Sequence, residues 1–298
     1  MKPKARRTFH VGREEAGMRL LSYLKSKLSP SYSAKMVKRA IDRHACMVNG
    51  KSESFSTYRV TFRDRVEFNE SRMLKLTSCE MQKICILYEN EELLIISKPG
   101  GVTSDNGEIK NHLPIKYPYL ELVHRLDRNT SGVLVLAKTP RARREMEDLF
   151  RNREIEKEYL AIVDGSPKKP KGSIENYLGK VSTWEGQSLF GAVPESEGRY
   201  ALTEYKTLAT GVGLSLLKVS PQTGRTHQIR THLKSIGTPI LGDYQYARSF
   251  RSSFEVSRQM LHAHKLSFTF QGEKIYVTAP LTREMRELIN EIYQVSDC

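Results

Sequence analysis

The 298-residue sequence is poor in cysteine and contains no long apolar run. Its four cysteines form neither a CxxC pair nor the Cys/His spacing of a zinc site, so we expect neither a disulfide framework nor structural zinc. No apolar run reaches the roughly 18 residues needed to cross a bilayer, and the basic start at residues 1–7 leads into no signal-type apolar core. These absences favour a reduced, cytoplasmic protein with no membrane partner.

Nucleotide and metal motifs are missing as well. The sequence holds no glycine-rich loop of the phosphate-cradling or dinucleotide-binding kind, so we expect no nucleotide cofactor. Several histidines suggest a metal, but no carboxylate or cysteine accompanies them at the usual ligand spacing. We therefore expect no metal, and we expect the following imidazoles to orient loops or to contact a ligand: His124, His227, His232, His262 and His264.

Acidic residues are outnumbered by basic ones. The chain has 34 Asp and Glu against 48 Lys and Arg, which gives a formal net charge of +14. A field of this sign attracts polyanions and makes nucleic acid the leading partner. Residues 1–70 alone carry 16 Lys and Arg against 7 Asp and Glu, so the excess is concentrated at the front of the chain. The length suits one large domain or two ordinary ones.

The basic front begins with two helical patterns. Four leucines between residues 20 and 28 have helical spacing, and Ser33 offers an N-cap to a second helix whose apolar residues at 36, 37, 40 and 41 can face a core. The opposite face of this second helix carries a basic stripe: Lys35, Lys38, Arg39 and Arg43. Such a run is usually a solvated helix face. Because the apolar side is complete, the stripe is also free to meet phosphates, and charge alone leaves both interpretations open.

Small strands are expected after the second helix. Asn49-Gly50 marks a tight turn, and apolar residues alternate over 58–62 and at 66 and 68. Two short helices followed by small strands, with Asn-Gly at this place, resemble the alpha-L RNA-binding module first recognised in a ribosomal protein of the small subunit. The resemblance covers roughly residues 14–69 and implies a tether to structured RNA. We assign residues 1–70 to this small α+β domain, and residues 71–82, which lack a clear period, to a linker.

From residue 84 onward the pattern is mainly that of strands. Helices are expected over 141–153, from near Thr226, and from Thr282 to the C-terminal end. Residues 166–200 are rich in Pro, Lys and Gly, which predicts loops and short edge strands with no packed helix. Apolar or alternating runs predict strands at 84–88, 93–96, 133–137, 157–163, 201–205, 214–219 and 261–268. Residues 83–298 therefore predict an α+β domain with mainly antiparallel strands.

One carboxylate stands in an unusual place. Asp127 lies between Arg125 and Arg128, just ahead of the apolar run 133–137. An exposed Asp between arginines is most often a solvated ion pair that contributes little. An Asp held at a strand edge in a basic site is stabilised as the anion and can serve as a nucleophile. The stretch alone leaves both interpretations open.

Three separated segments bear on that choice: His124-Arg125-Leu126-Asp127 with Thr130-Ser131-Gly132, then residues 157–163, then residues 224–230. Together they resemble the RluA family of RNA pseudouridine synthases, with 237–243 and 261–263 as supporting matches. The resemblance runs from about residue 84 to 281 and implies a mixed, mainly antiparallel sheet of the pseudouridine synthase type. It also implies isomerisation of uridine in RNA, in which the base is detached from the ribose, turned, and rejoined through a carbon.

The resemblance assigns three catalytic roles. Asp127 matches the family nucleophile, which suits a reaction that breaks a glycosidic bond. Arg230 matches the arginine that pairs with this Asp; a bidentate guanidinium would stabilise the carboxylate and fix its rotamer, although a phosphate contact is the other interpretation of such a residue. Tyr159 matches the aromatic residue beside the uracil, although taken singly it is a core strand tyrosine. Because no second carboxylate stands beside Asp127, transfer back to the same sugar is favoured over hydrolysis.

RNA contacts are expected around these residues, namely at Arg125, Arg128, Arg225 and His227. A uridine in folded RNA must be extruded before Asp127 can reach its sugar, and Arg125 is placed to fill the vacated stack. The expected target is ribosomal RNA of the large subunit, with transfer RNA as the alternative. A non-catalytic ribosome-assembly factor that binds RNA through its basic face is the competing class. We expect no cofactor and favour a monomer.

Overall fold

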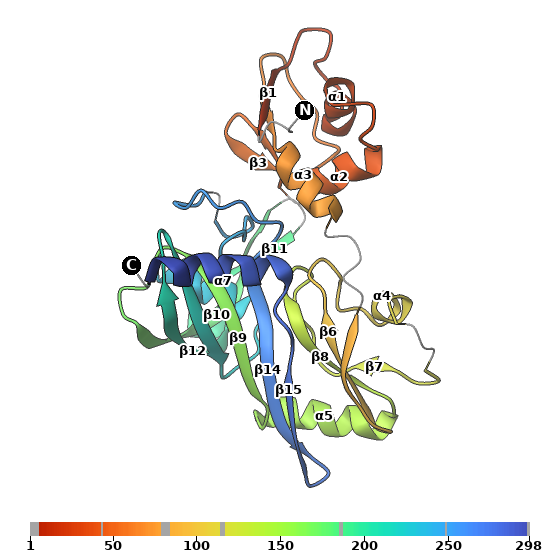
Figure 1. Ribbon diagram of the computed structural model, residues 1–298, viewed down its shortest axis with the longest axis vertical. Coiled ribbons are helices and arrows are strands. Elements are labelled where there is room, and N and C mark those ends of the chain that lie inside the picture. Colours follow the sequence, from red (N-terminus) through yellow and green to blue (C-terminus); the bar gives the residue numbers. More distant parts are fainter. Residues whose placement is uncertain are drawn as a thin grey trace. The chain divides into compact units, whose positions relative to one another are not determined.

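The computed structural model describes residues 6–42, 44–78, 84–113, 117–184, 187–247 and 249–296. The chain forms two compact units (Figure 1). The first comprises Met1–Gln82 with Trp184–Gln187 and Glu255–Ser257, and the second comprises Lys83–Thr183, Ser188–Phe254 and Arg258–Cys298.

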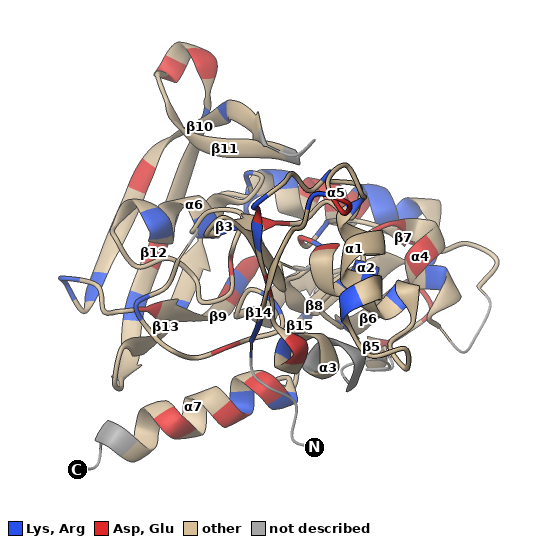
Figure 2. Ribbon diagram, turned by 90° about the horizontal axis from the view of Figure 1, so that it is seen from above, with Lys and Arg blue, Asp and Glu red and all other residues tan. Residues whose placement is uncertain are grey.

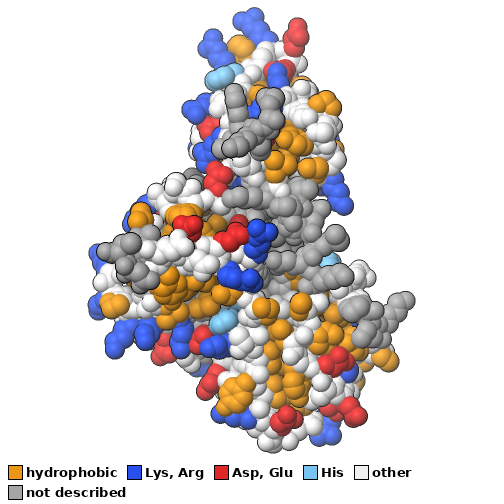
Figure 3. All heavy atoms as spheres, viewed as in Figure 1, with side chains coloured by type: hydrophobic (Ala, Val, Ile, Leu, Met, Phe, Trp, Pro, Cys, Tyr) orange, Lys and Arg blue, Asp and Glu red, His pale blue; other side chains and the backbone are white. Residues whose placement is uncertain are grey.

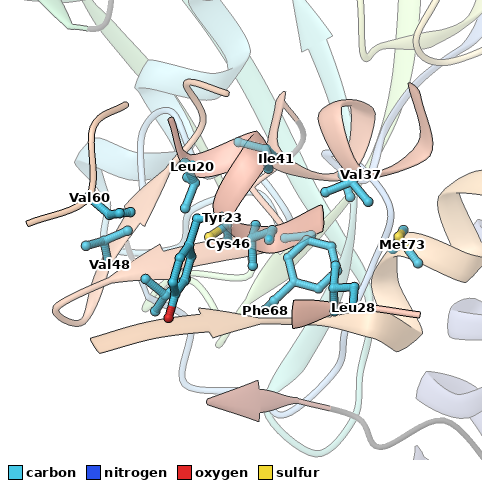
Figure 4. Close-up of a cluster of buried hydrophobic side chains, with 14 of the residues drawn as sticks. Leu20, Tyr23, Leu28, Val37, Ile41, Cys46, Val48, Val60, Phe68 and Met73 are labelled. Atoms are coloured by element: carbon cyan, nitrogen blue, oxygen red, sulfur yellow. The ribbon is translucent and has the colours of Figure 1, made fainter. Parts of the chain in front are cut away.

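The first unit is a small α+β domain around its own core. Its strands form one sheet in the order β1-β4-β2-β3, and its elements are β1 (Arg7–His10), α1 (Leu20–Lys27), α2 (Ala34–Asp42), β2 (Cys46–Val48), β3 (Lys51–Glu53), β4 (Arg65–Phe68) and α3 (Glu70–Ser78). Figure 4 shows how side chains from the helices and from the sheet meet in this core, among them Tyr23, Ile41 and Phe68, all fully buried. Exclusion of this apolar surface from water holds the small unit together.

The two predicted helices are confirmed. Ser33 Oγ accepts a hydrogen bond from the Met36 amide at 3.2 Å, as expected of an N-cap. Asn49 and Gly50 both have positive φ, which fits the predicted tight turn between β2 and β3. The alternation over residues 58–62 does not form a strand: Val60 is buried, but Phe62 is 44% exposed and only an isolated bridge joins Arg19 to Arg59.

The expected linker over residues 71–82 is wrong for its first part, because α3 occupies Glu70–Ser78. Asn69 Oδ1 accepts from the Arg72 amide at 2.8 Å and so caps the helix, and Met73 is fully buried in the core of the first unit. A helix of about two turns is too short to show a clear period in the sequence. Residues 79–82 lie outside the described residues.

The basic stripe on α2 is partly exposed. Lys35 and Lys38 are exposed on the side opposite the buried Val37 and Ala40, whereas Arg39 is half-buried. Arg43, the fourth member of the stripe, lies outside the described residues. Figure 3 shows Lys and Arg side chains at several places on the surface of this unit.

The second unit is built on an 11-stranded, mainly antiparallel sheet, which confirms the predicted fold class. The strand order is β11-β10-β12-β13-β9-β14-β8-β6-β5, with β15 paired to β14 and β7 paired to β8. Strands β14 and β8 run parallel. The strands are β5 (Cys85–Glu89), β6 (Leu93–Lys98), β7 (Glu121–Leu122), β8 (Ser131–Ala137), β9 (Glu156–Asp164), β10 (Lys171–Trp184), β11 (Gln187–Val193), β12 (Arg199–Thr210), β13 (Leu214–Pro221), β14 (Leu261–Phe270) and β15 (Glu273–Thr278).

Both faces of β6 and β8 are buried, which explains their uninterrupted apolar runs. Leu93 and Val135 face the cluster that contains Met146 of α5 (Pro140–Asn152). Leu94 and Leu134 face the opposite cluster; Ile109 of α4 (Asn106–Asn111) completes that side. β8, the strand that follows Asp127, is therefore buried between these two hydrophobic clusters.

The predicted helices of this unit are confirmed within one or two residues: α5, α6 (Gln228–Ser235) and α7 (Arg283–Ser296). Figure 2 shows α6 and α7 on opposite faces of the part of the sheet formed by β12 and β13. Residue 226 lies just outside α6, because His227 takes the N-cap position with φ of 55°. In the described part of the chain, no helix is long and apolar enough to cross a membrane.

The region 166–200 differs from the prediction. Instead of loops and short edge strands it contains the 14-residue strand β10 and the strand β11, followed by one short 3-10 turn at Glu195–Glu197. Most described residues of β10 are exposed or half-buried, so neither face carries the apolar alternation by which a strand is recognised. Pairing with β12 along residues 171–178 extends this strand well beyond what the local sequence indicates.

Candidate active site

The loop that carries Asp127 is fixed by its backbone on both sides. Ser104 Oγ donates to the Leu126 carbonyl at 2.8 Å and accepts from the Leu126 amide at 3.0 Å. The Asp127 carbonyl accepts from the Thr130 amide at 3.0 Å, just before β8 begins. The Asp127 side chain itself is 27% exposed, so it is held in place and still open to a ligand.

A fully buried lysine anchors the same loop. Lys98 Nζ, at the end of β6, donates to the carbonyls of Pro99, Val102 and Arg128 at 3.1, 2.8 and 3.2 Å. Burial, with the nearby Arg258 as a second cause, lowers the pKa of Lys98 to about 7. The sequence shows this lysine only as the residue before Pro99-Gly100, at the end of a hairpin, and gives no sign that it faces inward.

Arg230 joins Asp127 to a second acid. From α6, its Nη1 donates to Asp127 Oδ2 at 3.1 Å. Its Nε and Nη2 donate to the two carboxylate oxygens of the buried Asp243, both at 2.7 Å, and Nη2 also reaches Gln245 Oε1 at 2.7 Å. Burial by itself would lower the pKa of Arg230, but the carboxylates of Asp243 and Asp127 outweigh burial and raise it.

The predicted bidentate pairing of Arg230 with Asp127 is therefore wrong in detail. The bidentate partner is Asp243, and Asp127 receives a single hydrogen bond. Asp243 holds two of the guanidinium donors in a fork and thereby aims the third nitrogen at Asp127. Asp243 stands in a supporting motif of the sequence, but nothing in its local pattern shows that it faces Arg230.

Tyr159 lies on β9 and packs against the cluster that contains Leu126, next to the Asp127 loop. Burial, and secondly the charge of Asp127, raises the pKa of the Tyr159 hydroxyl. The phenol is therefore un-ionised at neutral pH. The structure thus brings together the three residues that the sequence proposes as catalytic, from the loop before β8, from β9 and from α6.

His227 lies on the other side of the carboxylate. Its Nε2 is 3.8 Å from Asp127 Oδ1, and its Nδ1 is hydrogen-bonded to the Tyr246 hydroxyl at 2.7 Å. Burial and the neighbouring Arg230 lower the pKa of His227 to about 4, so the ring is neutral at pH 7 and the 3.8 Å approach is no ion pair. Its ring edge also meets Phe190 of β11, with centroids 5.6 Å apart.

The β10–β11 hairpin is tied to the same group of side chains. The Tyr246 hydroxyl accepts from the Phe190 amide at 3.1 Å, and Gln245 Nε2 donates to the Ser188 carbonyl at 3.3 Å. Gln245 therefore contacts both the hairpin backbone and Arg230. The sequence places none of these four residues, Ser188, Phe190, Gln245 and Tyr246, at the site, because contacts across more than 50 residues leave no local signal.

The proposed RNA-contacting arginines of this unit differ in exposure. Arg125 and Arg128 are exposed on either side of Asp127, and Arg128 Nε donates to the Gly101 carbonyl at 3.1 Å. Arg225 is half-buried, and its Nε donates to the Tyr200 carbonyl at 2.9 Å. RNA contacts by these arginines and by His227 stay predictions.

Three other histidines have structural partners. His124 Nε2 accepts from the Val135 amide at 3.0 Å, His262 Nδ1 is bonded to Ser131 Oγ at 2.8 Å, and His264 Nδ1 lies 3.2 Å from the Ala279 carbonyl. Burial lowers the pKa of His124 and of His262 to about 3. Among the described residues, no group of three or more His, Cys, Asp or Glu is arranged to hold a metal ion.

The chemistry open to this site follows from its groups. A partly exposed carboxylate, held by a buried guanidinium and close to an un-ionised phenol, can attack an electrophilic carbon or stabilise a positive charge that develops on it. The phenol and the neutral imidazole can handle a proton or stack on a ring. These groups fit the class of enzymes in which a carboxylate acts on a sugar carbon.

Comparisons with known proteins narrow this class. Residues 92–235 match the family model described as RNA pseudouridylate synthase. An RNA pseudouridine synthase of Chlorobaculum parvum is 32% identical over 97% of this chain and 98% of its own length. A ribosomal large subunit pseudouridine synthase C of Escherichia coli is 30% identical over 94% of both chains.

Solved structures agree in fold. Human RNA pseudouridylate synthase domain containing 1 superposes with a TM-score of 0.56 at 25% identity and covers 70% of this chain and 94% of its own. Human RNA pseudouridylate synthase domain containing 4 gives a TM-score of 0.60 at 24% identity, over 75% and 97% of the two chains. The chain belongs to the RNA pseudouridine synthase family, and it is an isomerase that acts on uridine in RNA.

Proposed function

We propose that this chain isomerises specific uridines of large-subunit ribosomal RNA, with Asp127 as nucleophile, Arg230 as its partner and Tyr159 beside the uracil. The observation that carries the catalytic assignment is the 3.1 Å hydrogen bond from Arg230 Nη1 to Asp127 Oδ2. The target rests on relatives named ribosomal large subunit pseudouridine synthase C, which match over nearly the whole chain.

The geometry suits the reaction step by step. Arg230 holds Asp127 Oδ2, while Oδ1 accepts no hydrogen bond in the described part of the chain and is available to the ribose. Attack at C1′, or charge stabilisation there, accompanies cleavage of the bond from C1′ to N1 of uracil. The freed base turns and C5 bonds to C1′, and a bond that Asp127 has formed to C1′ breaks in this step and restores the carboxylate. N1 gains a proton and C5 loses one. The ring of Tyr159 can stack on the base, and its hydroxyl can handle the proton that C5 loses.

Release of the C5 proton provides the assay. Unmodified transcripts of large-subunit ribosomal RNA, labelled with tritium at C5 of uracil, are incubated with the wild-type protein and with Asp127→Ala. We expect tritium release by the wild type and none above background by the variant. Equal release by both proteins would remove Asp127 from its role as nucleophile.

The same assay separates the alternatives. Release from transfer RNA transcripts, with none from ribosomal RNA, would replace the proposed target. Release from neither RNA, together with binding to ribosomal RNA, would favour a non-catalytic assembly factor. Against that alternative stands the Asp127–Arg230–Asp243 arrangement, because binding alone has no need of a half-open acid fixed by a buried cation.

Arg125 has a proposed role of its own. Its side chain is exposed and adjoins Asp127 in sequence, which supports a role in filling the gap that an extruded uridine leaves in the RNA stack. We expect Arg125→Ala to slow turnover on a uridine in a base-paired stem and to spare a uridine in a single strand, where no stack has to be replaced. Unchanged turnover on the paired target would contradict this role.

The first unit is proposed as the RNA tether, through the exposed Lys35 and Lys38 of α2. In the full chain, changing both lysines to Gln should raise KM for ribosomal RNA and leave kcat nearly unchanged, because phosphate contacts position the RNA and take no part in the chemistry. Lys168→Gln with Lys169→Gln, in an exposed loop of the second unit, removes the same charge and serves as the control. An equal rise in KM in both double variants would remove α2 from this role.

A further inference from the structure

Four cations gather in the second unit, where α5 ends and where β9, β12 and the end of β13 lie close together: Arg153, Lys157, Arg199 and Arg225. Arg153 and Arg225 both act electrostatically on Lys157, and Arg199 and Arg153 both act on Arg225. The other three charges therefore each lie within electrostatic range of Arg225, although the four residues come from segments up to 72 residues apart in sequence. Figure 1 shows α5 leading directly into β9 at this end of the sheet.

Backbone carbonyls hold the two inner members of this cluster. Lys157 Nζ lies 3.5 Å from the Thr223 carbonyl, and Arg225 Nε donates to the Tyr200 carbonyl at 2.9 Å. Both side chains are half-buried, whereas Arg153 and Arg199 are exposed at the rim. Among the described residues, no carboxylate forms an ion pair with any of the four.

This arrangement costs free energy in the unliganded protein. Burial, and then the like charges of Arg153 and Arg225, lowers the pKa of Lys157; burial, and then Arg199 and Arg153, lowers that of Arg225. Cations forced together without a counter-charge repel one another, and a bound anion removes that repulsion. The nearby Lys218 and Lys265 show the contrast, since both pair with Glu158 on the other side of β9.

The cluster adjoins the catalytic group. Lys157 and Tyr159 are two residues apart on β9, so their side chains lie on the same face of the sheet. The charge of Lys157 also lowers the pKa of His124, as a smaller cause beside burial, and His124 precedes Arg125 and Asp127 in the chain. Arg225 is two residues before His227, whose ring lies 3.8 Å from the carboxylate of Asp127.

We propose that Arg153, Lys157, Arg199 and Arg225 form a binding site for one phosphodiester group of the substrate RNA, next to the uridine that enters the catalytic site. This inference rests on the proposed action on RNA and adds to it the position of a backbone contact. Lys157 and Arg225 are half-buried and hydrogen-bonded to backbone carbonyls, whereas Arg153 and Arg199 are exposed at the rim. Two inner and two outer cations suit an anion that is part of a polymer, because both sides of a phosphodiester group can then be contacted.

Lys157→Met is the decisive variant, because methionine keeps the unbranched apolar stem of lysine and removes the charged ammonium group. Lys265→Met is the matched control: it removes the same charge from the exposed side of the same sheet. Binding of a fluorescent single-stranded oligouridylate is measured by anisotropy over a series of salt concentrations. Thermal unfolding of the same proteins is measured in chloride and in inorganic phosphate at equal ionic strength.

We expect Lys157→Met to bind the oligouridylate about tenfold more weakly than the wild type. Its plot of log K against log salt should be shallower by about 0.7, the value for one phosphate of a single strand that the protein no longer neutralises. Its Tm should be no lower than that of the wild type, since removal of a repelled charge relieves strain; a purely structural lysine would instead lower Tm and leave the salt slope unchanged. Lys265→Met should match the wild type in both measurements.

Equal affinity and slope for the two variants would overturn the proposal. If inorganic phosphate stabilises the wild type more than Lys157→Met, but oligouridylate affinity is unchanged, the site takes a free anion and its assignment to RNA is wrong. Because binding is read without turnover, a protein that binds as expected but releases no tritium would support the phosphate site and overturn the proposed catalytic function.

Discussion

The two acids on Arg230 should respond to the same substitution in different ways. Asp243 is 2% exposed and forms a bidentate pair with a guanidinium that is itself 5% exposed, whereas Asp127 is 27% exposed and accepts one hydrogen bond. Asp243→Asn would leave a buried cation without its main counter-charge. Loss of one partner of a buried pair costs about 3–5 kcal/mol, which corresponds to a fall in Tm of about 10 °C for a domain of this size.

Asp127→Asn should change stability much less. Arg230 then keeps both hydrogen bonds to Asp243 and its bond to Gln245, and the lost pair is partly open to solvent. We expect a cost within about 1 kcal/mol. Activity should show the reverse order, with a loss of at least about 10³-fold for Asp127→Asn, because the reacting group is gone. Folded Asp243→Asn should lose up to about 10²-fold through misplacement of Arg230.

Thermal unfolding and tritium release on the same preparations test this reasoning, with release measured at a temperature at which all variants are folded. Asp148→Asn is the control for charge removal alone, because Asp148 is 57% exposed and pairs with Arg151 on the surface of α5. Equal losses of Tm in Asp127→Asn and Asp243→Asn would refute the assignment of a stabilising role to Asp243 and a catalytic role to Asp127. So would full activity in Asp127→Asn.

Three further outcomes follow from single features. Tyr159→Phe should keep RNA binding but slow tritium release. The pH profile of the wild-type rate should show no inflection from the Tyr159 phenol at or below about pH 10, because burial and the charge of Asp127 raise the pKa of this phenol. An inflection near neutral pH assigned to Tyr159 would contradict this. His232 and His262 are fully buried, and burial lowers their pKa values to about 4 and about 3. The unfolded chain therefore binds more protons than the folded chain as the pH falls below about 6.5. The free energy of unfolding, measured with urea, should fall by about 1.3 kcal/mol for each of these imidazoles between about pH 7.5 and about pH 5.5. A free energy of unfolding that stays constant over this range would contradict the lowered pKa values. Gly132→Ala should misfold, since φ is 115° and the new Cβ would lie 2.1 Å from the Ala263 carbonyl oxygen, whereas Gly224→Ala, which meets nothing within 4 Å, should keep its Tm.

Local chemistry predicts the elements whose signal lies in a few neighbouring residues. Ser33, the N-cap of α2, predicts the start of that helix, and the uninterrupted apolar run of β8 predicts a buried strand. The α3 helix and the long β10–β11 hairpin do not, because α3 is short and most of β10 is exposed or half-buried, so pairing with β12 decides its strand.

The sequence by itself determines that this chain is basic, that its catalytic unit is an α+β domain, and that Asp127, Tyr159 and Arg230 stand in motifs of one enzyme family. Only the tertiary structure decides that Asp243 is the bidentate partner of Arg230. It also decides that the buried Lys98 donates a hydrogen bond to the loop that carries Asp127. It alone also brings Lys157 within electrostatic range of Arg225. Composition and short motifs depend on neighbouring residues, whereas pairing and burial depend on which distant segments the sheet brings side by side.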